Sequence, residues 1–214
     1  MTTASRAWAD LDDAWREAFH QAWEALRGGN IAVGAVVTTP DGTLVSSSRN
    51  RVADRDGPAG QAFGSSIAHA EINALAHVPF RKHDRNLVLT TTLQPCFQCS
   101  AAIRMAPIGT VRVAGADPLW DGCHDFESHP TPWVARRPPI PMEGPRRDEI
   151  GVFGTLISRV GMGLIPPLEE ALREIGEGPI IDLARSLDVE ALCRLEVHQA
   201  LDALWDDLGR LSSR

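Results

Sequence analysis

Residues 87–114 have the sequence LVLTTTLQPCFQCSAAIRMAPIGTVRVA, which predicts a strand, a helix and a second strand in succession. The apolar run predicts a strand over 87–92, followed by a helix over 97–106 and a strand over 110–114. In this order they form a βαβ-like unit, whose two strands run parallel and whose helix covers one face of the sheet. We therefore expect an α/β protein with a mixed or parallel central sheet and helices on both faces.

Two cysteines at the start of this predicted helix have the spacing of metal ligands. Cys96 and Cys99 follow Pro95, and their separation places both side chains on one face of the first turn if Pro95 opens the helix. Unpaired backbone N–H groups at a helix start stabilise a thiolate, which is the form that binds zinc. Upstream, the motif His-Ala-Glu provides His69 as a third ligand and Glu71 as a carboxylate.

These two motifs together predict a catalytic zinc site. A catalytic zinc ion keeps three protein ligands, here His69, Cys96 and Cys99, and leaves its fourth position to water. Glu71 would then carry protons between water, a ring nitrogen and departing ammonia. The alternative is a closed structural zinc site, or a core histidine beside two buried thiols. A closed site normally uses a second pair of cysteines, so the combination favours catalysis with one Zn²⁺ per subunit.

The residues around these motifs resemble the cytidine deaminase-like superfamily, and most closely its guanine and tRNA-adenosine deaminase branch. The resemblance covers roughly residues 8–120. It is carried by TLQPCFQC at 92–99, VGAVV at 33–37, RNR at 49–51 and VRVAGADP at 111–118. It implies a three-layer α/β/α fold with a mixed sheet, hydrolytic removal of an exocyclic amine, and a homodimer in which a neighbour can help to line the pocket. It also implies that Asn50 hydrogen-bonds the substrate ring and that the backbone at Ala70 contacts it.

Three departures from this branch leave the subfamily open. Gln94 stands where the branch usually carries glutamate. Residues 52–66 are longer than the usual segment between the asparagine and the metal-binding histidine. Asn73 is reminiscent of deoxycytidylate deaminases, which the rest of the chain does not otherwise resemble.

Composition is that of one soluble enzyme domain with additions. The chain has 214 residues, with 28 acidic against 21 basic side chains and a net charge of −7. Nucleic-acid binders gain most of their affinity from basic surfaces, so the balance disfavours a nucleic-acid partner. No leader-like or membrane-spanning apolar run is present, and four cysteines give no disulfide framework. We therefore expect a cytoplasmic protein with no membrane partner.

The first half of the chain supplies the remaining elements of the predicted core. An apolar stripe of helical spacing predicts a helix over 8–26. Strands over 31–38 and 43–48 form a hairpin across a Pro-Asp-Gly turn. A helix over 68–77 carries the His-Ala-Glu motif in its first turn, where side-chain directions are less constrained.

The chain divides into a deaminase core over 1–125, a proline-rich loop over 126–147 and a C-terminal helical extension over 148–214. The loop predicts no regular element, and it is either a surface connector or a lid in which Trp133 closes over the substrate ring. Trp120 follows the last core strand and is a second candidate for substrate contact. The extension predicts helices over 148–160, 166–176, 179–186 and 188–209.

Three functions remain open at this point. The first is hydrolytic deamination of a small nucleobase or nucleoside, which accounts for every motif. The second is a tRNA adenosine-to-inosine deaminase, which the cysteine motif favours and the acidic charge disfavours. The third is a zinc-stabilised interaction module without catalysis, which has no need of Glu71.

Overall fold

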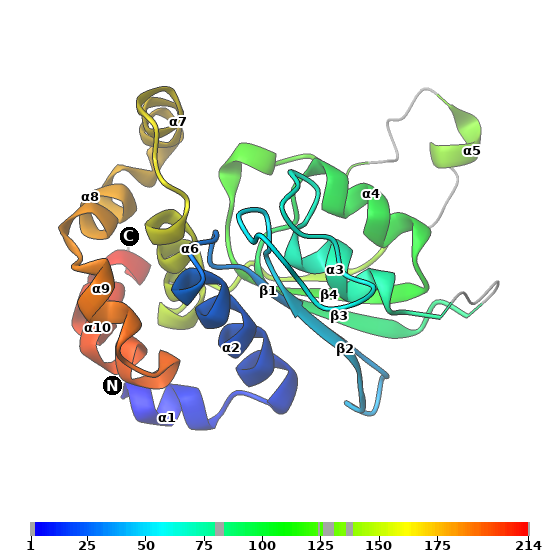
Figure 1. Ribbon diagram of the computed structural model, residues 1–214, viewed down its shortest axis with the longest axis horizontal. Coiled ribbons are helices and arrows are strands. Elements are labelled where there is room, and N and C mark those ends of the chain that lie inside the picture. Colours follow the sequence, from blue (N-terminus) through cyan, green and yellow to red (C-terminus); the bar gives the residue numbers. More distant parts are fainter. Residues whose placement is uncertain (1–2, 80–83, 124, 126–130, 136–138, 214) are drawn as a thin grey trace.

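The computed structural model describes residues 3–79, 84–123, 125, 131–135 and 139–213. Figure 1 shows a central sheet with helices on both faces and a further group of helices beside one of them. The expected three-layer α/β/α arrangement is therefore confirmed, and the C-terminal helices add a partial fourth layer.

The sheet has five strands in the order β2-β1-β3-β4-β5. The strands are β1 (Gly34–Thr38), β2 (Leu44–Arg49), β3 (Leu87–Leu93), β4 (Ile108–Gly115) and β5 (Met142–Glu143). β1 pairs antiparallel with both β2 and β3, whereas β3, β4 and β5 run parallel. The mixed sheet and the βαβ unit are thus as the sequence predicts.

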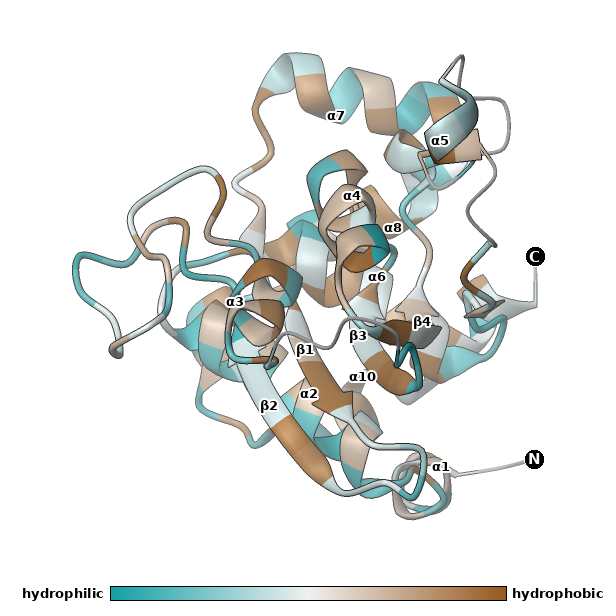
Figure 2. Cartoon of the chain, turned by 90° about the vertical axis from the view of Figure 1, so that its right-hand side faces the viewer, coloured by the Kyte–Doolittle hydropathy of each residue, from teal (hydrophilic) through white to brown (hydrophobic). Residues whose placement is uncertain are grey.

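Two helix layers cover the sheet. The helices on one face are α2 (Asp13–Arg27) and α6 (Glu149–Gly161), and those on the other are α3 (Ala70–Ala76) and α4 (Phe97–Met105). All five residues of β1 are buried because both of its faces are covered, which explains its continuous apolar sequence. Figure 2 shows β1 near the centre of the molecule, with α3 in front of it and α2 behind.

Glycines allow the helices of one layer to approach the sheet closely. A Cβ atom at Gly34 of β1 would lie 2.0 Å from the Ala18 carbonyl oxygen of α2. A Cβ atom at Gly154 of α6 would lie 2.4 Å from the Thr92 carbonyl oxygen of β3. Any larger residue at either position would push a helix away from the sheet.

The remaining helices on this side are α1 (Ala4–Ala9), α7 (Pro166–Leu172), the wider turn η2 (Arg173–Glu177), α8 (Gly178–Ser186), α9 (Val189–Cys193) and α10 (Val197–Ser212). Of these, α8 and α10 pack against α6, α9 packs against α2, α1 packs against α10, and α7 and η2 pack against α8. The apolar stripe of α10 joins a core cluster with α2 and α6, so it docks on helices rather than directly on the sheet. The indole of Trp23 in α2 donates to the Leu195 carbonyl at 2.8 Å and ties the two layers together.

Three of the predicted helices are interrupted. The stripe at 8–26 spans α1 and α2, because Asp12 caps a new helix by accepting from the Trp15 N–H at 3.0 Å. The helix predicted over 188–209 breaks into α9 and α10, because Glu196 and Gln199 form a capping box. The helix predicted over 166–176 leaves α-helical geometry at Arg173, and Gly176 has a φ of +95°.

The proline-rich loop contains short regular elements, contrary to the sequence prediction. α5 (Pro132–Ala135) begins with a proline, a residue that the first helical turn accepts. β5 is a two-residue edge strand beside β4, and Pro141 directly precedes it. A proline has no N–H to donate, and it is tolerated at the edge of a sheet because no interior hydrogen bond is lost there. Residues 126–130 and 136–138 lie outside the described residues. Across the described chain, none of the helices has the length and apolar character needed to cross a membrane.

Candidate active site

Three side chains with metal-binding groups meet where α3 and α4 begin. His69 is the N-cap of α3, Cys96 is the N-cap of α4, and Cys99 lies in the first turn of α4. His69 Nδ1 lies 3.4 Å from Cys96 Sγ and 3.5 Å from Cys99 Sγ, and the three ligand atoms lie within 4.8 Å of one another. This group has three members among the residues that the structure describes. One imidazole and two thiols fit Zn²⁺ and leave a fourth position for water.

The helix begins at Phe97, the first residue of the predicted range 97–106, but Pro95 does not open it. Pro95 precedes the N-cap instead of opening the helix, because the Cys96 carbonyl already accepts the Ser100 N–H at 2.8 Å. Cys96 therefore has extended backbone, with φ −71° and ψ 178°, and Cys99 occupies the third helical position. An N-cap side chain lies over the third helical residue, which brings the two sulfur atoms together.

Hydrogen bonds within this group distribute its protons unequally over the three ligands. Hydrogen bonds from Cys99 and then from His69 lower the pKa of Cys96 to about 4, so that this residue is a thiolate. Although burial opposes the effect, the hydrogen bond to Cys96 raises the pKa of His69. The pKa of Cys99 is raised, chiefly because it donates its proton to Cys96 and because it is buried. The site thus presents one thiolate, and zinc binding would displace the protons of the other ligands.

Glu71 lies beside the ligands and is almost completely buried, with 3% of its surface exposed. Its Oε2 accepts from Cys99 Sγ at 3.4 Å, and its Oε1 accepts from the Thr91 hydroxyl at 3.4 Å. Burial raises the pKa of this carboxyl group. A raised pKa makes a carboxylate a better proton acceptor, as general acid–base catalysis requires.

A cavity of about 360 Å³ opens next to these residues. Asn50, His69, Glu71, Cys96 and Trp120 all line it, although they come from four different segments. Asn50 is 3% exposed, and its Oδ1 accepts the Val52 N–H at 3.1 Å. This contact leaves the amide N–H₂ of Asn50 to donate into the cavity.

The structure places the two remaining candidates differently. Ala70 is the buried first residue of α3, directly between His69 and Glu71, but its side chain is not part of the cavity lining. Trp133 lies on α5 with 73% of its surface exposed and is not among the described residues that line the cavity.

Other parts of the cavity wall were not anticipated from the sequence. Met162 and Leu168 reach it from the C-terminal extension, where their helical pattern gave no sign of a role in the site. Gln94 and Asp117 also line it, at 6% and 2% exposure. Gln94 directly follows β3 and Asp117 lies just beyond the end of β4. These positions could have indicated a role in the site, since ligands bind at the carboxyl ends of parallel strands.

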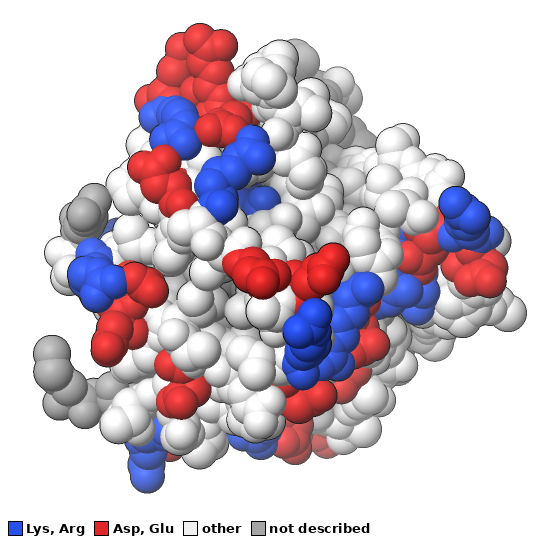
Figure 3. Space-filling view, turned by 60° about the vertical axis from the view of Figure 1, so that its left-hand side comes forward, with Lys and Arg blue, Asp and Glu red and all other residues white. Residues whose placement is uncertain are grey.

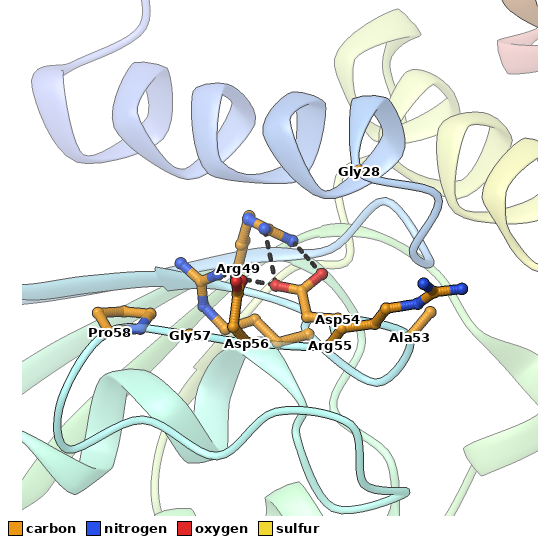
Figure 4. A pocket seen from close by; sticks show the side chains of 9 residues that line it. Gly28, Arg49, Ala53, Asp54, Arg55, Asp56, Gly57 and Pro58 are labelled. Carbon is orange, nitrogen blue, oxygen red and sulfur yellow. Dashed lines mark hydrogen bonds and ion pairs between the residues drawn. The ribbon is translucent and has the colours of Figure 1, made fainter.

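The insert at 52–66 does not contribute to this lining and folds elsewhere. Its Ala62 exchanges two hydrogen bonds with the side chain of Asn73 in α3, at 2.7 and 3.0 Å. Asp54 accepts from Asn30 at 2.6 Å and pairs with Arg49 and Arg51, each at 2.8 Å. Asp54, Arg49 and Arg51 line, with neighbouring residues, a second, polar cleft of about 660 Å³, which Figure 4 shows.

Comparisons with known proteins agree with this geometry. The family model described as the cytidine and deoxycytidylate deaminase zinc-binding region matches residues 9–115. The tRNA-specific adenosine deaminase 2 of Xenopus tropicalis is 26% identical over 123 residues, which are 53% of this chain and 67% of that protein.

A solved structure shares the fold. A guanine deaminase from Nitrosomonas europaea superposes with a TM-score of 0.51 at 18% identity, over 71% of this chain and 84% of that chain. A structure from work on tRNA:A34 deaminases, which perform A-to-I editing at the wobble position, gives a TM-score of 0.49 at 26% identity, over 61% of this chain and 96% of that chain. The chain belongs to the cytidine and deoxycytidylate deaminase family, whose zinc-dependent enzymes hydrolyse C–N bonds.

Proposed function

We propose that this chain is a zinc-dependent deaminase of a small nucleobase or nucleoside, replacing an exocyclic amine by a carbonyl with release of ammonia. The observation that carries the proposal is the position of Glu71. Its carboxylate is buried beside His69, Cys96 and Cys99 and lines the same cavity as Asn50. A structural zinc site has no use for a buried carboxylate in that place, because an unpaired charge is costly to bury.

Each residue has a distinct task in this reaction. His69, Cys96 and Cys99 would hold a zinc ion, which would supply Lewis-acid chemistry that makes water a stronger nucleophile. Glu71 takes a proton from water and delivers protons to the ring nitrogen and to the departing ammonia. The amide N–H₂ of Asn50 donates to the ring and orients it toward Glu71.

The size and lining of the cavity support a small substrate. Its volume of about 360 Å³ is at the lower end of the range for small-molecule sites. Met162 and Leu168 of the extension add apolar surface to its wall. Such a wall suits a flat heterocycle, because it excludes water from the reacting carbon.

The direct test is ammonia release from a panel of bases, nucleosides and nucleotides by the zinc-loaded protein. We expect release from at least one small ring, and we expect Glu71→Ala to abolish it while zinc content stays at one ion per chain. Zinc binding without Glu71-dependent release from any member of the panel would contradict the proposal and favour a non-catalytic zinc module.

A tRNA adenosine deaminase is the second candidate, because the Xenopus relative carries that name. The net charge of −7 is against it, since polynucleotide binding depends on basic surfaces. Figure 3 shows acidic and basic side chains interspersed over the face that includes the helical extension, without a continuous basic patch on that face. Ammonia release from an anticodon hairpin, with none from free bases or nucleosides, would move the assignment to tRNA editing.

We also propose a homodimer that works in the reducing cytoplasm. Phe97 and Met105 of α4 are 65% and 71% exposed, and Phe97 is the immediate neighbour of Cys96. Exposed apolar side chains at this position suit contact with a second copy. All four cysteines are free thiols, as expected in a reducing compartment. Light scattering on wild type and Phe97→Asp tests the dimer: the variant should shift to monomer, and a monomeric wild type would contradict it.

A further inference from the structure

The short segment at the end of β2 lines the catalytic cavity and the polar cleft at once. Asn50 is 3% exposed and lines the cavity, whereas its neighbours Arg49 and Arg51 line the cleft. Side chains alternate between the two faces of a strand, and this alternation continues just beyond the end of β2. A group that fixes the two arginines in the cleft therefore also acts on Asn50 from behind.

Asp54 fixes both arginines in the cleft. Its Oδ2 accepts from Arg49 Nη2 and from Arg51 Nη1, each at 2.8 Å. Its Oδ1 accepts from Arg49 Nη1 at 3.2 Å and from the amide of Asn30 at 2.6 Å. The side chain of Asp54 is 9% exposed, and those of the arginines are 16% and 15% exposed. Charged hydrogen bonds that are screened so little by solvent hold one geometry.

Two further hydrogen bonds extend this arrangement to the backbone around Asn50. Arg49 Nη1 also donates to the Asn50 carbonyl oxygen at 3.0 Å. The Arg51 N–H donates to the Ala68 carbonyl at 2.9 Å, directly before His69. The segment is thus fixed between the cleft on one side and the start of α3 on the other.

The side chain of Asn50 is oriented from the same direction. Its Oδ1 accepts the Val52 N–H at 3.1 Å, which leaves its N–H₂ for the cavity. The next N–H, of Ala53, donates to Asn30 Oδ1 at 2.7 Å, and the amide of this same Asn30 donates to Asp54. The turn that orients the Asn50 amide is therefore closed by the Asp54 carboxylate.

We propose that Asp54 is a positioning residue for deamination: through Arg49 and Arg51 it holds Asn50 where its amide orients the substrate ring. Asp54 does not line the catalytic cavity and moves no proton. The insert at 52–66 then contributes to catalysis although it folds outside the cavity. This inference rests on the proposed deaminase function.

Asp54→Asn is the decisive variant, because it keeps the size of the side chain. Either orientation of the new amide loses two of the four hydrogen bonds that the carboxylate accepts, together with the charge. On the panel ring that wild type deaminates fastest, kcat/KM should fall about 10- to 100-fold. Zinc content should stay at one ion per chain, because Asp54 is not among the three ligands.

A double-mutant cycle with Asn50 separates positioning from a general loss of stability. In the Asn50→Ala background, Asp54→Asn should lower kcat/KM by less than about threefold, because the residue through which Asp54 acts is already missing. Losses that multiply in the double variant would overturn the inference.

Two controls make the same chemical change elsewhere. Asp56→Asn alters an exposed carboxylate that lines the same cleft and, in the described part of the chain, pairs with neither arginine. Asp12→Asn alters a carboxylate that accepts from the Trp15 N–H and from Arg112, about 20 Å away at the other end of α2. Both should leave kcat/KM within about threefold of wild type, although Asp12→Asn should lower stability. An activity loss in either control equal to that of Asp54→Asn would overturn the inference.

Nuclear magnetic resonance follows the Asn50 amide without any need for activity. In isotope-labelled, zinc-loaded protein, its side-chain N–H₂ signals are identified by their absence from Asn50→Ala. They should shift or broaden in Asp54→Asn and stay in place in Asp56→Asn and Asp12→Asn. Unchanged signals in Asp54→Asn overturn the inference, while ammonia release by wild type still upholds the proposed function. Changed signals in Asp54→Asn alone, without ammonia release from any ring by wild type, support the hold of Asp54 on Asn50 and reject the proposed function.

Discussion

The polar cleft and the catalytic cavity both hold buried carboxylates, but the two regions compensate these charges differently. In the cleft, Asp54 accepts from two arginines and from Asn30, so that its charge is fully matched. In the cavity, the side chain of Glu71 accepts from a hydroxyl and a thiol, each at 3.4 Å, and no arginine pairs with it among the described residues, while Asp117 shares one guanidinium with another carboxylate. Charges are matched where they hold an insert in place, and are left under-compensated where a substrate and a metal ion are to bind.

The largest effect should follow from changing the least compensated charge. Glu71→Gln removes the proton carrier but keeps its shape, so kcat should fall about 10²- to 10⁴-fold. Zinc content should remain at one ion per chain, because Glu71 is not among the three ligands. Steady-state ammonia release and metal analysis measure both quantities. Glu170→Gln, on an exposed side chain, is the control, and equal losses in the two variants would contradict the assignment.

The second effect tests the shared guanidinium. Arg159→Met leaves two buried carboxylates, Asp117 and Glu177, without their common partner. Breaking a buried pair in this way should lower the free energy of unfolding by about 3–5 kcal/mol. Urea denaturation measures the loss, and Arg194→Met at an exposed position should change stability by less than about 0.5 kcal/mol. A loss for Arg159→Met as small as that of the control would show that the cavity charges do not depend on Arg159.

The sequence predicted the parts of the site whose chemistry is local. His69, Glu71, Cys96 and Cys99 stand in two short motifs, and the structure brings all four together. The strand order could be anticipated only to the level of a mixed sheet, because pairing between distant strands depends on packing that no local pattern encodes.

The far wall of the cavity could not be predicted for the same reason. Met162 and Leu168 are ordinary apolar residues near helix ends, and only the docking of α6 and α7 on the core turns them toward the substrate. Arg159 appeared as one more charged residue in a predicted helix. Its burial against Asp117 depends on a contact across 42 positions of the chain.

The third effect should be smaller and tests compensation in the cleft. Arg49→Met removes one partner of Asp54, while Arg51 and Asn30 remain. The free energy of unfolding should therefore fall by about 1–2 kcal/mol, less than for Arg159→Met. Urea denaturation of the two variants side by side measures the difference. An equal or larger loss for Arg49→Met would remove the contrast between the two regions.

The smallest effect distinguishes the two carboxylates by the sign of their pH dependence. Burial opposes it, but hydrogen bonds from Asn30, Arg49 and Arg51 hold the pKa of Asp54 below its usual value. The contribution of Asp54 to the free energy of unfolding is thus complete above its pKa in the unfolded chain. It is lost as pH falls through its lower pKa in the folded protein.

The contribution of Asp117 to stability changes with pH in the opposite direction. Burial raises its pKa despite the contact with Arg159, so stability from the protonated form is lost as pH rises through the raised folded value. Between about pH 3 and 6, the stability of wild type minus that of Asp54→Asn should increase with pH, and that of wild type minus Asp117→Asn should decrease. Urea denaturation across this range measures both differences. If the two differences had the same sign of slope, cleft and cavity would compensate their charges alike, and the contrast between the two regions would have no support.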